Sequence, residues 1–414
     1  MKKNVNIIIL VFIVFVCYLF GMFNLTNNSI TCGLLTSSKI GNDVEEDVFN
    51  DYIEEQSNFN YDKIKNEVYT SAKSMALVDA NSYRLLVGKN YEQKLPMAST
   101  TKVVTALTVL NNCSDVNQEV LVSDKAIGIP GTSIYLRKGE KLTVKELLYG
   151  LMLSSGNDAA VALAIHVSGS IQEFCEEMKK TAISCGALNS SFDNPHGLDS
   201  KNHYTTALDL ALITSKALEN ETFKEIVTTK NITIKGTNEG EKRYLKNKNK
   251  LLTKLDGCIG VKTGFTNDAG RCLVSAVEKD GKKLVCVVLN CGPMFEESMD
   301  ILNYGLDYYT NYELLAPYNY ISNVAVLNGK KDKCKIYTKN SCNYLLNSFE
   351  RSQIEYIYDI PASIEAGLKK DTVIGELKIY LNKNLIFSEK IYTMEEIESI
   401  DLSKKLEDII EEWF

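Results

Sequence analysis

Short apolar runs separated by polar turns open the first structured part of the chain, and longer stretches with helical spacing follow. Residues 75–78 and 83–87 have the composition of strands, and the polar residues 79–82 between them predict a hairpin. Thr143 and Glu146 have the spacing of a capping box at the start of a helix. Apolar positions at helical spacing predict helices over 101–110, 144–153, 158–167, 171–185 and 206–218.

Strand-like patterns return in the middle of the chain, near residues 232–234, 258–262, 273–277 and 284–289. Asp280-Gly281 separates the last two of these strands and is a strong hairpin-turn sequence. We expect one more helix after Pro293, ending near residue 309. Strands, then helices, then strands predict an α+β domain over 67–312, with helices on one side of an antiparallel sheet.

Beyond residue 317 the pattern becomes short and β-like. Strands are expected at 324–327, 335–337, 354–357, 373–379 and 385–391, which predicts a smaller all-β domain over 313–394. Residues 395–414 have apolar positions at helical spacing and predict an amphipathic C-terminal helix that ends in Trp413 and Phe414. Eight acidic residues against two lysines in this segment predict only weak attachment to an anionic membrane surface.

The N-terminus has the pattern of an export signal. Lys2 and Lys3 precede an apolar run over residues 7–23, which is typical of a secretory signal peptide or an uncleaved membrane anchor over 1–24. Residues 25–66 are polar and acidic and predict a spacer. We therefore expect the folded part to be exported, with the N-terminal segment as the main membrane tether if it is not cleaved.

Composition narrows the functional classes. Of the 414 residues, 45% are apolar and 24% are charged, as in ordinary globular proteins. The net charge of −7 predicts no polycationic surface for nucleic acid. The three histidines lack metal-ligand spacing, and we expect neither a metal nor a cofactor. The 11 cysteines contain no C-x-x-C pair and predict mostly free, buried thiols, with one or two disulfides left open.

Ser99 and Lys102 are the first candidates for chemistry. Their S-x-x-K spacing opens the most apolar predicted helix of the domain and places both side chains on one face. A serine hydroxyl needs a base to act as a nucleophile, and an amine desolvated at a helix N-terminus has a lowered pKa. The alternative is a helix cap followed by a surface lysine.

Two further motifs contain polar side chains suited to peptide chemistry. Ser155 and Asn157, between two helices, can relay a proton and hold a substrate carbonyl, although Asn157 can equally be a helix cap. Lys262, Thr263 and Gly264 end the strand expected at 258–262. At an edge strand they would suit a peptide that binds as an added strand through its free carboxylate. A lysine before a turn is the commoner meaning of such a sequence.

The order S-x-x-K, S-x-N and K-T-G is that of penicillin-binding proteins and class A β-lactamases. Over residues 70–395 the chain resembles the low-molecular-mass penicillin-binding proteins that are serine D-Ala-D-Ala carboxypeptidases. The resemblance implies a β-lactamase/transpeptidase-like catalytic domain with a small all-β C-terminal domain. Besides the motifs, it is carried by residues 96–105, 131–152, 155–160, 194–198, 260–266 and 367–391.

The resemblance also implies roles for individual residues. Ser99 would be the nucleophile that is acylated, with Lys102 as its base, during removal of the terminal D-Ala from peptidoglycan stem pentapeptides. β-Lactams would be covalent inhibitors. The enzyme would lie at the extracytoplasmic face of the bacterial membrane or in the cell wall. The remaining catalytic and substrate-binding residues would be Ser155, Asn157, Lys262, Thr263, Gly264, Phe265 and Thr266.

The oxyanion hole and the carboxylate-binding candidates depend on the resemblance alone, whereas His196 and the basic stretch below are interpreted from the residues. The backbone N–H groups of Ser99 and Phe265 would form the oxyanion hole. Arg271 and Lys283 are candidates for binding the terminal carboxylate, and His196 is expected to stabilise a turn. The basic stretch 242–254 is expected to form a solvated hairpin rather than a polyanion site.

Two alternatives remain open from the sequence. A class A β-lactamase would need a glutamate three residues before the pair Leu188-Asn189, and this chain has Cys185 there. A catalytically inactive wall-associated homologue would usually have lost Ser99, Lys102 or Lys262, and all three are present.

Overall fold

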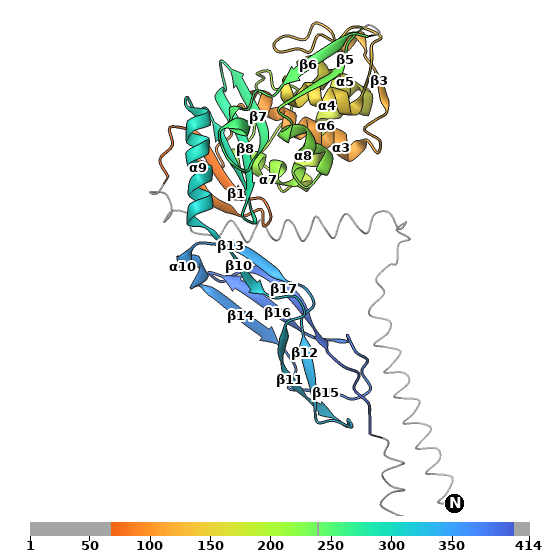
Figure 1. Cartoon of the computed structure of the whole chain (residues 1–414), viewed down its shortest axis with the longest axis vertical. Helices are drawn as coiled ribbons and strands as arrows, with labels where there is room; N and C mark the ends of the chain where they lie inside the picture. Colours follow the sequence, from red (N-terminus) through yellow and green to blue (C-terminus); the bar gives the residue numbers. More distant parts are fainter. Residues whose placement is uncertain (1–67, 238–239, 401–414) are drawn as a thin grey trace, which may run out of the picture. The chain divides into compact units, whose positions relative to one another are not determined.

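A computed structural model describes residues 68–237 and 240–400. Its first domain is built on a five-stranded antiparallel sheet in the order β2-β1-β9-β8-β7, which brings the first hairpin beside the last three strands (Figure 1). Because β7 has a neighbour on one side only, it is an edge strand. The strands are β1 (Ser74–Asp79), β2 (Leu85–Lys89), β7 (Cys258–Thr266), β8 (Gly270–Lys279) and β9 (Lys282–Leu289).

Helices cover both faces of this sheet, so the expectation of helices on one side is wrong. All six residues of β1 are buried, and a strand with both faces apolar needs cover on both sides. Helix α9 (Met294–Tyr308) packs on one face through Ile301 and Leu302. The other face carries a cluster of α3 (Lys102–Asn112), α4 (Val144–Leu153), α5 (Asn157–Ser168), α6 (Ile171–Ser184), α7 (Ala207–Ala217) and α8 (Glu221–Thr228).

The local signals in the sequence are confirmed closely. The side chain of Thr143 accepts from the backbone of Glu146, and the Glu146 carboxylate accepts in return, so the capping box is present. Asp280 and Gly281 form the turn between β8 and β9. The short elements are η2 (Ala98–Thr101), β3 (Glu119–Leu121), η3 (Asp124–Ala126), β4 (Lys141–Thr143), β5 (Asn231–Lys235), β6 (Lys242–Lys246) and η4 (Lys250–Thr253).

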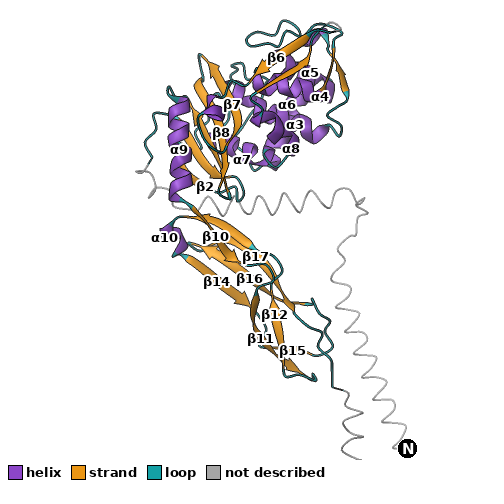
Figure 2. Cartoon of the chain, in the orientation of Figure 1, coloured by secondary structure: helices purple, strands orange, loops and turns teal. Residues whose placement is uncertain are grey.

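The second domain is almost entirely β-structure, as predicted (Figure 2). Its six-stranded sheet has the order β14-β16-β17-β12-β11-β15, and β10 pairs separately with β13. Its core contains Ile336, Leu377, Ile379 and Ile391. The elements are β10 (Thr310–Leu315), β11 (Tyr320–Leu327), β12 (Lys333–Tyr337), β13 (Cys342–Leu346), α10 (Ser348–Arg351), β14 (Ile354–Asp359), β15 (Ser363–Glu365), β16 (Val373–Leu381) and β17 (Asn384–Thr393).

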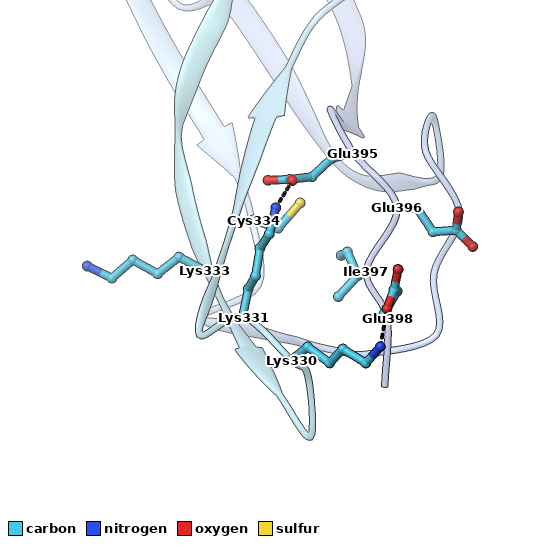
Figure 3. A pocket seen from close by; sticks show the side chains of 8 residues that line it. All are labelled: Lys330, Lys331, Lys333, Cys334, Glu395, Glu396, Ile397 and Glu398. Atoms are coloured by element: carbon cyan, nitrogen blue, oxygen red, sulfur yellow. Dashed lines mark hydrogen bonds and ion pairs between the residues drawn. The ribbon is translucent and has the colours of Figure 1, made fainter. Parts of the chain in front are cut away.

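Residues 395–400 form no helix, and Ser399 forms an isolated β-bridge with Gly329, so the helix predicted to begin at residue 395 does not begin there. Glu395 and Glu398 form ion pairs with Lys331 and Lys330 beside a shallow pocket (Figure 3). Ile397 is buried between them, and its backbone exchanges hydrogen bonds with residues 367 and 368. Backbone hydrogen bonds to the loop at 367–368 and to the turn between β11 and β12 therefore outweigh the helical spacing of the apolar residues. The rest of the predicted helix, 401–414, lies outside the described residues.

Nine cysteines fall within the described residues, and all are free thiols, seven of them buried. This agrees with the predicted preference for free, buried thiols. No helix in the described ranges is both long and apolar enough to cross a membrane. The predicted signal or anchor at 1–24 and the spacer at 25–66 lie outside those ranges.

Candidate active site

Ser99 lies on the 3-10 turn η2, which runs directly into α3. The preceding residue, Ala98, has a φ of 48°, in the left-handed region, and its carbonyl accepts from the hydroxyl of Thr101 at 2.8 Å. Two glycines pack closely against this turn. A Cβ on Gly197 would lie 1.9 Å from the Ala98 oxygen, and one on Gly264 would lie 3.1 Å from the Ser99 nitrogen. Glycine at both positions therefore allows the strained turn to be held in place.

The Lys102 amine is fully buried and points at the Ser99 hydroxyl. Its Nζ lies 3.0 Å from Ser99 Oγ, 2.7 Å from Asn157 Oδ1 and 2.6 Å from the carbonyl oxygen of His196. A neutral amine has two N–H donors and one lone pair. The protonated amine donates to all three oxygens, and when it loses a proton, the donors retained toward Asn157 and His196 leave the lone pair toward Ser99. This is the arrangement that a general base requires.

Electrostatics favour the neutral form of this amine. Burial lowers the pKa of Lys102 well below its ordinary value, and the positive charges of Lys262 and Lys248 lower it further. Asp158 acts in the opposite direction and raises the pKa of Lys102. Desolvation of the charged form is the largest of these effects, so the amine acts as a base closer to neutral pH than an exposed lysine does.

Ser155 and Asn157 reach the site from the turn between α4 and α5. Ser155 is buried with a φ of 62°, and Thr132 holds the turn by donating to the Ser155 oxygen at 2.6 Å. The Asn157 amide donates to the carbonyl of Pro130 at 2.6 Å while its oxygen accepts from Lys102. Gly156 is the N-cap residue of α5 and no side chain caps this helix. Asn157 is therefore a partner of Lys102, and the alternative that it caps the helix is wrong.

The K-T-G motif lies within the edge strand β7, which continues through Thr266 rather than ending at Gly264. Lys262 is buried and donates to the carbonyl of Thr263 at 2.9 Å. Burial and the charge of Lys248 lower the pKa of Lys262 to about 7. Thr266 donates to the Asp199 carboxylate at 2.7 Å. The carboxyl-terminal part of the strand is thus fixed to the loop that follows Gly197.

A cleft of about 470 Å³ lies between these elements. Its walls include Ser99, Ser155 and Asn157 on the helical side, and Thr263 to Thr266 on the strand side. Lys262 is buried and is not among the residues that line the cleft. The remaining lining residues are Gly131, Thr132, His196, Gly197, Leu198, Lys248, Lys250, Met294 and Phe295. Among the described lining residues there is no carboxylate, so the cleft favours a negatively charged ligand.

The two carboxylate-binding candidates from the sequence do not lie in this cleft. Lys283 pairs in register with Glu278, five residues along β8 from Leu273, the partner of Thr263. At 3.4 Å per residue that separation is about 17 Å. Arg271 lies opposite Phe265 on β8, is exposed and does not line the cleft.

Lys248 and Lys250, which were expected in a solvated hairpin, are the cations that line the cleft, and Lys248 is the one whose charge acts on Lys102. Lys248 follows β6 in an irregular segment, where the Asn249 backbone donates to the side chain of Asn247. Asn247 and Asn249 on either side of Lys248 are typical of turns in which a side chain bonds to the backbone, and they were the one sequence signal that could have located Lys248. His196 behaves as predicted: its ring accepts from the backbone of Leu198 within the turn at 3.3 Å. Burial lowers the pKa of His196 to about 3, so the ring is neutral near pH 7.

Comparison with known proteins finds a matching family model for each of the two domains. Residues 62–292 match the D-alanyl-D-alanine carboxypeptidase family, and residues 309–399 match the C-terminal domain of penicillin-binding protein 5. The D-alanyl-D-alanine carboxypeptidase DacF of Bacillus subtilis is 30% identical over 75% of this chain and 83% of its own. The corresponding DacA of Haemophilus influenzae is 30% identical over 82% of this chain and 88% of its own.

Solved structures agree with this assignment. Penicillin-binding protein 5 of Haemophilus influenzae superposes with a TM-score of 0.67 at 27% identity, covering 81% of this chain and 99% of that one. The DD-transpeptidase of Streptomyces K15 covers 58% of this chain and 99% of its own, with a TM-score of 0.55 at 32% identity. The predicted α+β transpeptidase-like fold and the all-β C-terminal domain are confirmed. The chain belongs to the D-alanyl-D-alanine carboxypeptidase family, the low-molecular-mass penicillin-binding proteins that are serine peptidases.

Proposed function

We propose that this chain removes the terminal D-Ala from peptidoglycan stem pentapeptides through an ester on Ser99. The observation that carries the proposal is the position of the Lys102 amine, whose nitrogen lies 3.0 Å from Ser99 Oγ and also donates to the oxygens of Asn157 and His196. A buried neutral amine in this position removes the hydroxyl proton during attack.

The reaction proceeds in two steps. Ser99 Oγ attacks the carbonyl carbon of the penultimate residue while its proton moves to Lys102. The backbone N–H groups of Ser99 and Phe265 stabilise the oxyanion. The C–N bond then breaks, and the leaving amine takes a proton through the Ser155 hydroxyl. Water hydrolyses the ester in the second step, which releases the shortened peptide and restores Ser99.

Lys248 and Thr263 would bind the carboxylate of the terminal D-Ala. Both line the cleft, and Thr263 belongs to the edge strand β7, where a peptide can add as a further strand. Lys248 is close enough to the reacting groups for its charge to lower the pKa of Lys102 and Lys262. A cation close to the reacting groups suits the carboxylate of the terminal D-Ala, because that carboxylate is only one residue from the scissile bond.

The same attack on a β-lactam would leave a covalent adduct, so β-lactams act as inhibitors. Because peptidoglycan lies outside the cytoplasm, the enzyme works on the extracytoplasmic side of the membrane. Residues 1–24 would tether it there, with a weaker contribution from 401–414. Loss of liposome binding on deletion of each segment tests this part of the proposal.

Mass spectrometry of purified muropeptides tests the activity directly. Pentapeptides incubated with the enzyme should lose one alanine, and Ser99→Ala should abolish both this loss and labelling by a fluorescent penicillin. Labelling that survives unchanged in Ser99→Ala would overturn the assignment of the nucleophile. Rapid turnover of penicillin would instead favour a β-lactamase.

A further inference from the structure

Two exposed ammonium groups, on Lys248 and Lys250, lie on the wall of the cleft. Neither forms an ion pair with any carboxylate of the described residues, whereas many other lysines of the chain are paired. The cleft therefore has one cation more than the terminal carboxylate of a D-Ala peptide needs. The protein as a whole is acidic, with a net charge of −7, so this local excess of positive charge is a property of the site.

The two lysines have different neighbours. The charge of Lys248 acts on both Lys102 and Lys262, which places it near the reacting groups. The Lys250 ammonium lies over the ring of Phe295, 5.4 Å from the ring centroid. Phe295 follows Met294 at the start of α9, and both line the cleft. The aromatic ring gives the flexible lysine side chain a preferred position at the rim.

The surroundings of Lys250 suit a carboxylate that arrives with an extended peptide. Phe265, with 63% of its surface exposed, and Leu198 are apolar residues that line the same cleft. Lys250 itself is exposed, so a substrate lying over it would remove water and strengthen its interaction with an opposite charge. A substrate that fills the cleft would exclude more water from it.

We propose that Lys250 recognises a second carboxylate, located on the acyl side of the scissile bond in the stem peptide. The inference rests on the proposed function, since it concerns the substrate of the same site. Lys250 is a specificity-determining residue, whereas Lys248 binds the carboxylate that is common to all D-Ala-D-Ala peptides. Stem peptides offer two such groups: the α-carboxylate of the γ-linked D-glutamyl residue, and a carboxylate on the side chain of the third residue.

Four synthetic pentapeptides separate these sources. They have diaminopimelate as the third residue and differ only in whether the D-glutamyl carboxylate, the side-chain carboxylate, both or neither is converted to a carboxamide. We would measure kcat/KM for release of D-Ala by the full-length wild type, by Lys250→Gln and by Lys254→Gln. Lys254 is an exposed lysine four residues along the chain that does not line the cleft, so it is the matched control.

The wild type should cleave a peptide with the recognised carboxylate about 3-fold to 5-fold more efficiently than its carboxamide, as expected for a partly exposed ion pair. The difference should appear mainly in KM and should shrink at high salt. It should disappear in Lys250→Gln and persist in Lys254→Gln. Which carboxamide causes the loss identifies the group that Lys250 binds.

Two results would overturn the inference alone: equal kcat/KM of the wild type for all four peptides, or a preference that persists in Lys250→Gln. Failure of the proposed function would look different. In that case the wild type would release D-Ala from none of the peptides, and Ser99 would form no adduct with penicillin.

Discussion

Replacing Lys102 with methionine is the most direct test of the proposed base. Methionine keeps the length and apolar stem of the side chain and removes only the amine. The amine lies 3.0 Å from Ser99 Oγ, and no other titratable side chain of the described residues has a hydrogen bond to that oxygen. A general base contributes about 10²–10⁴ to the rate, which is about 3–5 kcal/mol at 1.36 kcal/mol per factor of ten.

A second variant separates catalysis from structure. In Lys102→Met the oxygens of Asn157 and His196 lose their donor, and each unsatisfied buried acceptor costs about 1–3 kcal/mol of stability. Lys102→Arg keeps N–H donors for both oxygens, but a guanidinium stays protonated and cannot take a proton. Both variants should therefore acylate slowly, and only the methionine variant should lose the two hydrogen bonds. Thermal unfolding of each variant measures the loss of stability, separately from the loss of the catalytic base.

The assay is the rate of covalent labelling by a fluorescent penicillin, with intact-protein mass spectrometry to confirm one adduct. Lys254→Met, on an exposed lysine outside the cleft, is the control. The folded-state pKa of Lys102 is lowered, so the neutral fraction and the wild-type rate rise with pH and level off above that pKa. The variants should lack this dependence. Near-normal acylation by either variant at pH 7 would refute Lys102 as the base.

Three further predictions follow from single contacts. Lys248→Gln should raise KM about 5-fold for peptides with a free terminal carboxylate and much less for their C-terminal amides, as measured by steady-state kinetics. Gly197→Ala should slow penicillin labelling at least 10-fold, because its Cβ would lie 1.9 Å from the Ala98 oxygen and displace the nucleophile turn. Arg84→Met should cost about 3–5 kcal/mol in urea unfolding, since it leaves the Glu350 carboxylate, now 2.7 Å from the guanidinium, buried without its partner.

Local sequence signals predicted most of the first domain, because they fix local structure. The capping box at Thr143 and the turn at Asp280-Gly281 specify element ends within a few residues of chain. Helix α8 was missed since it has only eight residues and a single buried side, formed by Phe223, Ile226 and Val227. Strands β10 and β13 were missed because each is stabilised by pairing with the other across 26 intervening residues, which no local pattern reveals.

The candidate site was predicted in part for the same reason. Ser99 and Lys102 are one helical turn apart, so their proximity follows from local geometry. That Asn157 accepts from Lys102 depends on tertiary packing and was not predicted, since the family resemblance placed Asn157 only among the catalytic residues. The carboxylate candidates Arg271 and Lys283 failed because charge on a strand says nothing about its register. Lys248 was overlooked because an irregular segment has no periodicity from which to place its side chains.

The absence of a carboxylate from the described lining of the cleft bears on how the Ser99 ester is hydrolysed. Under the proposed mechanism the water must be activated by a base already at the site, and the Lys102 amine is the one in contact with Ser99 Oγ. When D-Ala leaves, the space beside Lys248 becomes available to water. The leaving nitrogen of an opened β-lactam stays tethered to the acyl group and keeps that space filled. Cys185, at the position of a lactamase glutamate, is buried at the end of α6 and offers no second route. The site therefore has one base and one position for the attacking water. Water can occupy that position after D-Ala leaves, so the peptide ester is hydrolysed. The opened β-lactam blocks it, so the penicillin adduct persists.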